Sequence, residues 1–115
     1  MFPGLSSYSM TKLVALQISA YLEAEYPHLT SVSLHPGTVL TDMTIEPLVR
    51  FSVDTAELVG AVGVWLSTGD RKFLSGRYVT VNWDVEELVA RKEEIVEGGK
   101  LKINLVGDFG EDQFK

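Results

Sequence analysis

The first stretch of the chain predicts one long helix whose apolar side chains spread over more than one face. It runs from Ser6 to Glu25 and has apolar residues at positions 13, 14, 16, 18, 20 and 22. Residues three or four apart share a helical face, so this spacing is wide enough for two faces to be covered. Pro27 ends the pattern, because proline lacks a backbone N–H and restricts the residue before it. The pattern therefore predicts that two faces of this helix can be covered, whether within one monomer or by another subunit.

Two β-rich segments follow the helix. Thr30–His35 reads as a strand and runs directly into a Pro36-Gly37 turn, while Tyr78–Trp83 is apolar at alternate positions and follows Ser75-Gly76. Proline fixes the exit from a strand, and glycine allows close approach of the backbone. His35 directly precedes the turn, and a lone histidine there is interpreted as a packing or hydrogen-bonding residue.

Two further helices are predicted from capping patterns. Asp54 followed by Glu57 is typical of a capping box at the start of a helix over residues 55–68, whose apolar residues imply strong burial. Asp84 with Glu87 predicts a third helix that ends near Glu97. Residues 101–106 alternate between apolar and polar, so they form either a short strand or an extended tail.

Tyr8 and Lys12 stand one helical turn apart on the same face of the first helix. A phenol has a pKa of about 10, which makes it a poor acid–base catalyst at neutral pH. A nearby cation lowers the pKa of a phenol, which can then exchange a proton with an alcohol or ketone oxygen. The pair therefore suggests carbonyl–alcohol redox chemistry. The alternative interpretation is an exposed lysine beside a partly buried tyrosine.

Three patterns occur in order: Tyr8-x-x-x-Lys12, Pro36-Gly37-x-x-x-Thr41 and Ser75-Gly76. In this order and spacing they resemble the short-chain dehydrogenase/reductase family from Gly4 to about Val106. The Trp-Asp-Val-Glu-Glu-Leu segment at residues 83–88 is similar to fungal members. The resemblance implies an α/β fold. It would be a partial Rossmann-like fragment of a doubly wound parallel sheet, with about three helices and two to three strands.

The resemblance also implies roles for individual residues. Tyr8 would be the acid–base catalyst, and Lys12 would hold the ribose of NADP or NAD and lower the pKa of the tyrosine. Hydride would pass between the nicotinamide and a small-molecule carbonyl or alcohol substrate. Residues 42–52 would form the substrate lid. The cofactor site would be lined by Tyr8, Lys12, Pro36, Gly37, Val39 and Thr41, with Val39 supplying backbone groups and Thr41 contacting the carboxamide or the phosphates.

Two family features do not occur in this sequence. The resemblance implies a catalytic serine about a dozen residues before the tyrosine. Only seven residues precede Tyr8, and no G-x-x-x-G-x-G or G-x-G-x-x-G phosphate loop is found. One interpretation is the catalytic C-terminal half of a reductase without its nucleotide-binding half. The other is a catalytically inactive truncated relative that at most pairs with another subunit, forming a homo-oligomer through the Ser6–Glu25 helix.

Composition narrows the possible partners. Sixteen acidic and ten basic residues give a net charge of −6, which disfavours binding to a nucleic acid backbone. The sequence has no apolar run of about 20 residues, so we expect no membrane-spanning helix. The absence of cysteine fits a reducing compartment, and a cytoplasmic location is expected. We expect one partial domain over residues 1–115, ordered to residue 106 with a frayed tail over 107–115, and no metal site.

Overall fold

The computed structural model describes residues 3–39, 41, 46 and 54–107. These residues form a mixed helix and strand architecture, which confirms the predicted α/β class and a partial Rossmann-like fragment. In chain order the elements are α1 (Ser6–Glu25), β1 (Ser33–His35), α3 (Ala56–Ser67), the 3₁₀ turn η1 (Lys72–Leu74), β2 (Tyr78–Thr80), α4 (Val85–Ala90) and α5 (Lys92–Glu97).

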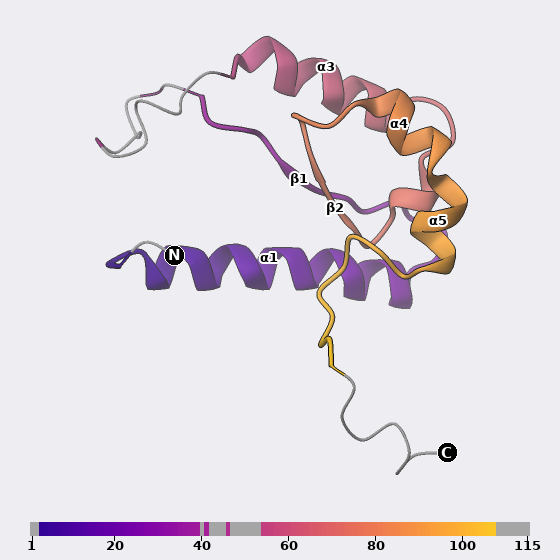
Figure 1. Cartoon of the computed structure of the whole chain (residues 1–115), viewed down its shortest axis with the longest axis horizontal. Helices are drawn as coiled ribbons and strands as arrows, with labels where there is room; N and C mark the ends of the chain where they lie inside the picture. The colour runs from indigo at the N-terminus through magenta and orange to yellow at the C-terminus, as the bar shows by residue number, and fades with distance from the viewer. Residues whose placement is uncertain (1–2, 40, 42–45, 47–53, 108–115) are drawn as a thin grey trace.

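The two strands lie side by side and run in the same direction. Ser33 is in register with Tyr78, and His35 with Thr80. Parallel neighbours need a long crossover connection, and here α3 lies on that connection. Figure 1 shows α1 along one side of the strands and α3 and α4 on the other. The Val81 N–H donates to the His35 carbonyl oxygen at 3.1 Å, so the carboxyl ends of both strands meet at one edge of the sheet.

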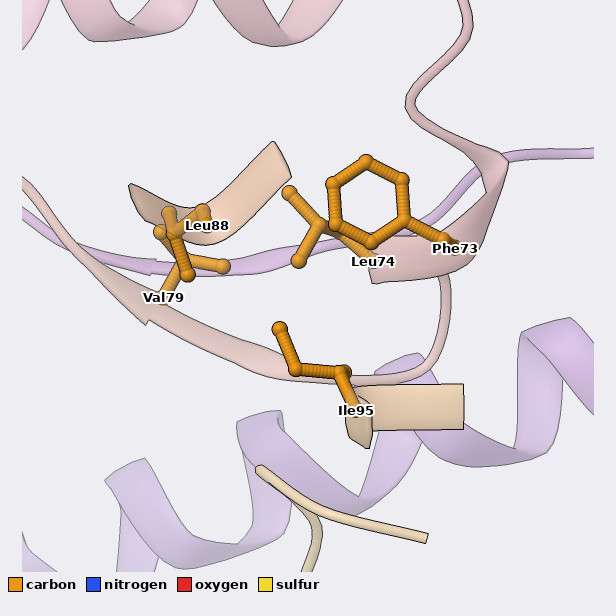
Figure 2. Packing of buried hydrophobic residues seen from close by; sticks show 5 residues of the cluster. All are labelled: Phe73, Leu74, Val79, Leu88 and Ile95. Atoms are coloured by element: carbon orange, nitrogen blue, oxygen red, sulfur yellow. The ribbon is translucent and has the colours of Figure 1, made fainter. Parts of the chain in front are cut away.

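A small apolar core joins β2 to the helical elements around it. Figure 2 shows its five buried side chains, which come from η1, β2, α4 and α5: Phe73, Leu74, Val79, Leu88 and Ile95. Leu34, Trp65 and Leu101 are partly buried and pack against this cluster. Complete burial of one large aliphatic side chain contributes about 1.5–3 kcal/mol, so the cluster holds β2 to the helices that follow it.

Helix α1 has the predicted bounds, but it is attached to the sheet along a narrow stripe. Ser19 is its only buried residue, and the Ser19 hydroxyl donates to the Ser31 carbonyl oxygen at 2.8 Å. Gly76 lies so close to the helix that an added Cβ would be 3.0 Å from the Cβ of Glu23. The burial predicted for two faces of α1 is not found in the described part of the chain. Its large exposed apolar side chains are Tyr8, Met10, Leu13, Val14, Ile18 and Tyr21.

Two predictions about α3 were wrong. Asp54 does not cap the helix, because Thr55 is the N-cap residue and its hydroxyl accepts from the Leu58 N–H at 3.2 Å. Strong burial was also expected, yet Val62 is the one buried residue of α3, and Val64 is 64% exposed. The β-conformation of Thr55 places its own hydroxyl over the free amides of the first turn, and this leaves the neighbouring carboxylate available for other contacts.

The last predicted helix is divided in two. Asp84 caps α4 as expected, with its carboxylate accepting from the N–H groups of Glu86 and Glu87. The Glu87 carboxylate does not complete a capping box; it pairs with Arg91, the residue at which α4 ends and α5 begins. Residues 101–107 contain no strand, although the Tyr78 N–H donates to the Leu101 carbonyl oxygen at 2.8 Å. The segment is therefore not a strand, and it contacts the start of β2 through Leu101.

Other sequence-based expectations lie outside the described residues. The lid predicted over 42–52 falls there, except for residue 46, as does the predicted tail from residue 108 onward. Within the described part, no helix combines the length and apolar character needed to cross a bilayer. The described residues also contain no group of three or more histidine, aspartate or glutamate side chains placed to hold a metal ion.

Candidate cofactor and catalytic site

Tyr8 and Lys12 lie in the first turns of α1. The tyrosine is 62% exposed, and the Lys12 Nζ lies 5.3 Å from the centroid of its ring. The negative face of an aromatic ring attracts an ammonium at this distance. The predicted neighbourhood of phenol and cation is therefore present on an open helical face. Such a pair can offer a hydroxyl proton and a positive charge to the same bound molecule.

The turn after β1 has the conformation that its glycine permits. Gly37 has a φ of +74°, in the left-handed region that residues with a Cβ rarely adopt. Its N–H donates to Nδ1 of His35 at 3.0 Å, and the His35 ring lies 6.2 Å from that of Tyr78. His35 is thus a hydrogen-bonding and packing residue, as the sequence indicated. The histidine ties the turn back to the end of its own strand.

Asp54 holds the same turn from the other side. Its Oδ2 accepts from the Thr38 N–H at 2.7 Å, and its own N–H donates to the Thr38 carbonyl oxygen at 3.1 Å. The other carboxylate oxygen, Oδ1, accepts from Nδ2 of Asn82 at 2.6 Å. Thr80 donates its hydroxyl to Oδ1 of Asn82 at 3.2 Å. We call Thr38, Asp54 and Asn82 the Asp54 clamp.

The structure divides the six predicted site residues into two groups. Tyr8 and Lys12 form a pair on α1, while the other four follow β1. Of these four, Pro36 and Thr41 are exposed, and Gly37 and Val39 are half-buried. Figure 1 shows the start of α1 and the segment after β1 at the same end of the molecule. Their roles toward a cofactor stay predictions.

Sequence reasoning missed Asp54 and Asn82 as parts of this site. Asp54 was interpreted as a helix cap, and local sequence does not decide between it and Thr55, since both residue types cap helices. The position of Asn82, which follows the second strand, could have identified it as a site residue. In open α/β sheets, ligands bind beyond the carboxyl ends of the strands, and Asn82 stands there.

Comparison with known proteins places the chain in a family. It is 40% identical over 109 residues to the short chain dehydrogenase mpl6 of Monascus purpureus and equally to citE of Monascus ruber. Each match covers 90% of this chain and 37% of the relative. The short chain dehydrogenase andI of Emericella variicolor is 39% identical over 107 residues, which is 89% of this chain and 37% of the relative.

The chain thus spans little more than a third of the length of these relatives. No family model matches it, and no solved structure matches it. Because several fungal short chain dehydrogenases match at 36–40% identity over about nine-tenths of its length, the chain belongs, as a partial sequence, to the short-chain dehydrogenase/reductase family.

Proposed function

We propose that this chain carries the proton-transfer pair and the cofactor turn of a nicotinamide-dependent oxidoreductase that acts on a carbonyl or alcohol substrate. The observation that carries the proposal is the placement of the Lys12 ammonium 5.3 Å from the ring centroid of Tyr8 on an exposed face of α1. The similarity to proteins named short chain dehydrogenases supports the same reaction class.

The chemistry assigned to the chain is the movement of one proton. The Tyr8 hydroxyl donates its proton to a carbonyl oxygen during reduction, or a tyrosinate accepts the proton of an alcohol during oxidation. The ammonium of Lys12 can donate hydrogen bonds to ribose hydroxyls. NADP or NAD, when bound, supplies or accepts the hydride. Both side chains are exposed, so each can reach a bound molecule.

The donor groups of the chain fit the nicotinamide–ribose part of such a cofactor. A phenol and an ammonium suit ribose hydroxyls and a substrate oxygen, and the turn after β1 lies at the carboxyl edge of the sheet. Gly37 gives this turn its positive φ of +74°. The glycine-rich phosphate loop of the family does not occur in this sequence, so the proposal assigns no pyrophosphate contact to these residues.

A thermal melt of the 115-residue chain with and without millimolar NADPH tests the proposal. We expect a cooperative unfolding transition whose midpoint temperature NADPH raises, because a ligand that binds only the folded state stabilises that state. Lys12→Ala should remove most of the shift. Lys92→Ala on α5 is the matched control and should retain it. A wild-type transition that ignores both NADPH and NADH would contradict the proposal.

The proton-transfer role needs its own test. With a panel of aldehydes, ketones and secondary alcohols, Tyr8→Phe should lower the rate of nicotinamide turnover by about 100-fold or more. Tyr21→Phe removes a hydroxyl from the same helix, also from an exposed ring, and should leave that rate unchanged. Equal effects of the two substitutions would exclude Tyr8 as the proton donor.

A second candidate function is subunit pairing through α1, without catalysis. It is favoured by one observation, namely the row of exposed apolar side chains on this helix that includes Val14 and Ile18. Isolated exposed apolar residues are ordinary, but a contiguous face is typical of an interaction surface. The face would bind a second copy of the chain and so form a homo-oligomer.

Sedimentation velocity separates this candidate from a monomer. We expect a concentration-dependent dimer that Ile18→Glu dissociates, because a buried unpaired charge is costly. Val96→Glu also places a charge on an exposed apolar position, but on α5, and should leave the dimer intact. A wild-type chain that stays monomeric at about 100 μM would exclude pairing with a Kd tighter than that concentration.

A further inference from the structure

We infer that Asp54 is a positioning residue that sets the conformation of the turn after β1, with Asn82 holding the carboxylate in place. The inference rests on the proposed function for the role of the turn, namely contact with a nicotinamide cofactor. It deepens that proposal, because it assigns the shape of the cofactor turn to two residues outside the turn. The geometry of the Asp54 clamp carries the inference.

Two distant segments converge on the carboxylate of Asp54. Thr38 lies 16 residues before Asp54 and Asn82 lies 28 residues after it, and both donate to it. The two distances, 2.7 and 2.6 Å, are at the short end for N–H donors, as is typical when the acceptor is charged. Each carboxylate oxygen therefore has its own partner, and the carboxylate is fixed between the carboxyl ends of both strands.

The carboxylate serves the turn and not the helix beside it. Asp54 directly precedes the N-cap of α3, a place where an aspartate is usually interpreted as a cap. Thr55 already supplies the capping oxygen through its bond from the Leu58 N–H. The carboxylate of Asp54 accepts instead from Thr38, and the Asp54 N–H donates back to the Thr38 carbonyl oxygen at 3.1 Å. This reciprocal pair joins the two ends of the connection between β1 and α3.

The shape of the turn is also matched to the carboxylate. A Cβ added to Gly37 would lie 2.5 Å from Oδ2 of Asp54 and 2.7 Å from its Cγ. Real Cβ atoms do not approach other atoms so closely, so any side chain at position 37 would have to displace the carboxylate or the turn. The positive φ of Gly37 adds a second requirement for glycine. Asp54 and Gly37 thus occupy complementary space.

Amide hydrogen exchange, measured by NMR on the 115-residue chain, tests the clamp directly. Asp54→Ala should speed exchange of the Thr38 amide about tenfold or more, because its acceptor is lost. The Leu58 amide is bonded to Thr55 and should keep its wild-type rate. Asp54→Asn retains an acceptor oxygen and should restore much of the protection. Asp70→Ala is the matched control, since Asp70 Oδ1 also accepts a backbone N–H, from Lys72 at 3.1 Å.

Asn82→Ala provides a second test of the clamp if Asp54→Ala does not fold. It removes one bond to the carboxylate and leaves the reciprocal pair with Thr38 intact, so Thr38 exchange should rise about threefold, less than in Asp54→Ala. A Thr38 amide that keeps its wild-type exchange rate in both Asp54→Ala and Asn82→Ala would overturn the clamp, whatever the chain does with NADPH.

Titration with NADPH well below the melting temperature links the clamp to the cofactor. We expect the Kd for NADPH to rise about fivefold or more in Asp54→Ala, to recover partly in Asp54→Asn and to stay at the wild-type value in Asp70→Ala. If the wild type binds and Asp54→Ala binds equally well despite faster Thr38 exchange, the positioning role is overturned. If Thr38 exchange responds but the wild type ignores NADPH, the proposed function fails while control of the turn by Asp54 stands.

Discussion

The hydroxyl of Ser19 donates to the carbonyl oxygen of Ser31 at 2.8 Å, and this contact joins α1 to the segment that leads into β1. The Ser31 N–H in turn donates to Oγ of Ser75 at 3.1 Å. Tyr8 precedes Ser19 by eleven residues, which is about 16 Å along a helix. A small change in the tilt of α1 at Ser19 therefore moves Tyr8 by a larger distance. The position of the proposed proton donor depends on a contact far from it.

Ser19→Ala should lower the free energy of unfolding by about 1–2 kcal/mol, because it removes a hydrogen bond at a buried position and leaves Ser31 with fewer partners. Urea denaturation followed by circular dichroism measures the change. Ser9→Ala is the control on the same helix, at an exposed position, and alanine there should be neutral or slightly stabilising. Equal unfolding midpoints for the two variants would show that Ser19 does not anchor α1.

Gly76→Ala should destabilise the chain by about 1–2 kcal/mol or more, because its φ of +72° lies in the left-handed region. The new Cβ would also press on Glu23 at 3.0 Å. Gly60→Ala in α3 is the matched substitution, since an added Cβ there meets nothing within 4 Å. That change should stabilise the chain by about 0.5–1 kcal/mol. Thermal denaturation of both variants should give shifts of opposite sign, and shifts of one sign would contradict the prediction.

Leu74→Ala should cost about 2–5 kcal/mol, because it removes a large side chain from a fully buried site and leaves a cavity. In Figure 2 Leu74 lies between Phe73 on one side and Val79 and Leu88 on the other. Leu105→Ala makes the same chemical change at a fully exposed position and should alter stability by less than about 0.5 kcal/mol. Denaturant unfolding checks both, and a small loss for Leu74→Ala would place the core elsewhere.

The carboxylate of Glu94 pairs with Arg91 and Lys100 on the surface of α5. The hydrogen bond from Arg91, followed by that from Lys100, lowers the pKa of Glu94 to about 2. A depressed carboxylate pKa contributes stability that is present above the unfolded value, near 4.5, and is lost as pH falls toward 2. The Glu94 contribution should therefore disappear within this window.

An NMR titration of the Glu94 carboxyl carbon measures this shift. We expect a midpoint near 2 in the wild type and a midpoint closer to 4.5 in Arg91→Ala, because the strongest donor is removed. High salt should reduce the difference, since both partners are exposed. A wild-type midpoint that Arg91→Ala leaves unchanged would show that the ion pair does not persist in solution.

Local sequence patterns predicted several elements closely. The bounds of α1 are those expected from its periodicity and from Pro27, and Asp84 caps α4 as its position suggested. The Tyr8–Lys12 neighbourhood also followed from spacing, because residues four apart in a helix lie one turn apart in any fold. These features depend on neighbours within a few residues, and a sequence contains that information directly.

Other features depended on contacts between distant segments. The capping pattern at Asp84 predicted one helix that ends near Glu97, whereas Arg91 ends α4 and pairs with Glu87 and Glu94 on either side. The apolar content of α3 implied burial, but burial is set by what packs against a face, and Val64 faces solvent. Hydropathy indicates that a side chain favours burial, but it does not show whether another element packs against that side chain.

The sequence by itself determined the α/β class, the helix that carries Tyr8 and Lys12, and the glycine in the turn after β1. Only the tertiary structure decided what that turn contacts. Asp54 and Thr55 are both competent caps, and the choice between them depends on Thr38 and Asn82, which lie 16 and 28 residues from Asp54. Helical periodicity follows from local backbone geometry. The partner of a carboxylate follows from which strand ends the parallel register brings together.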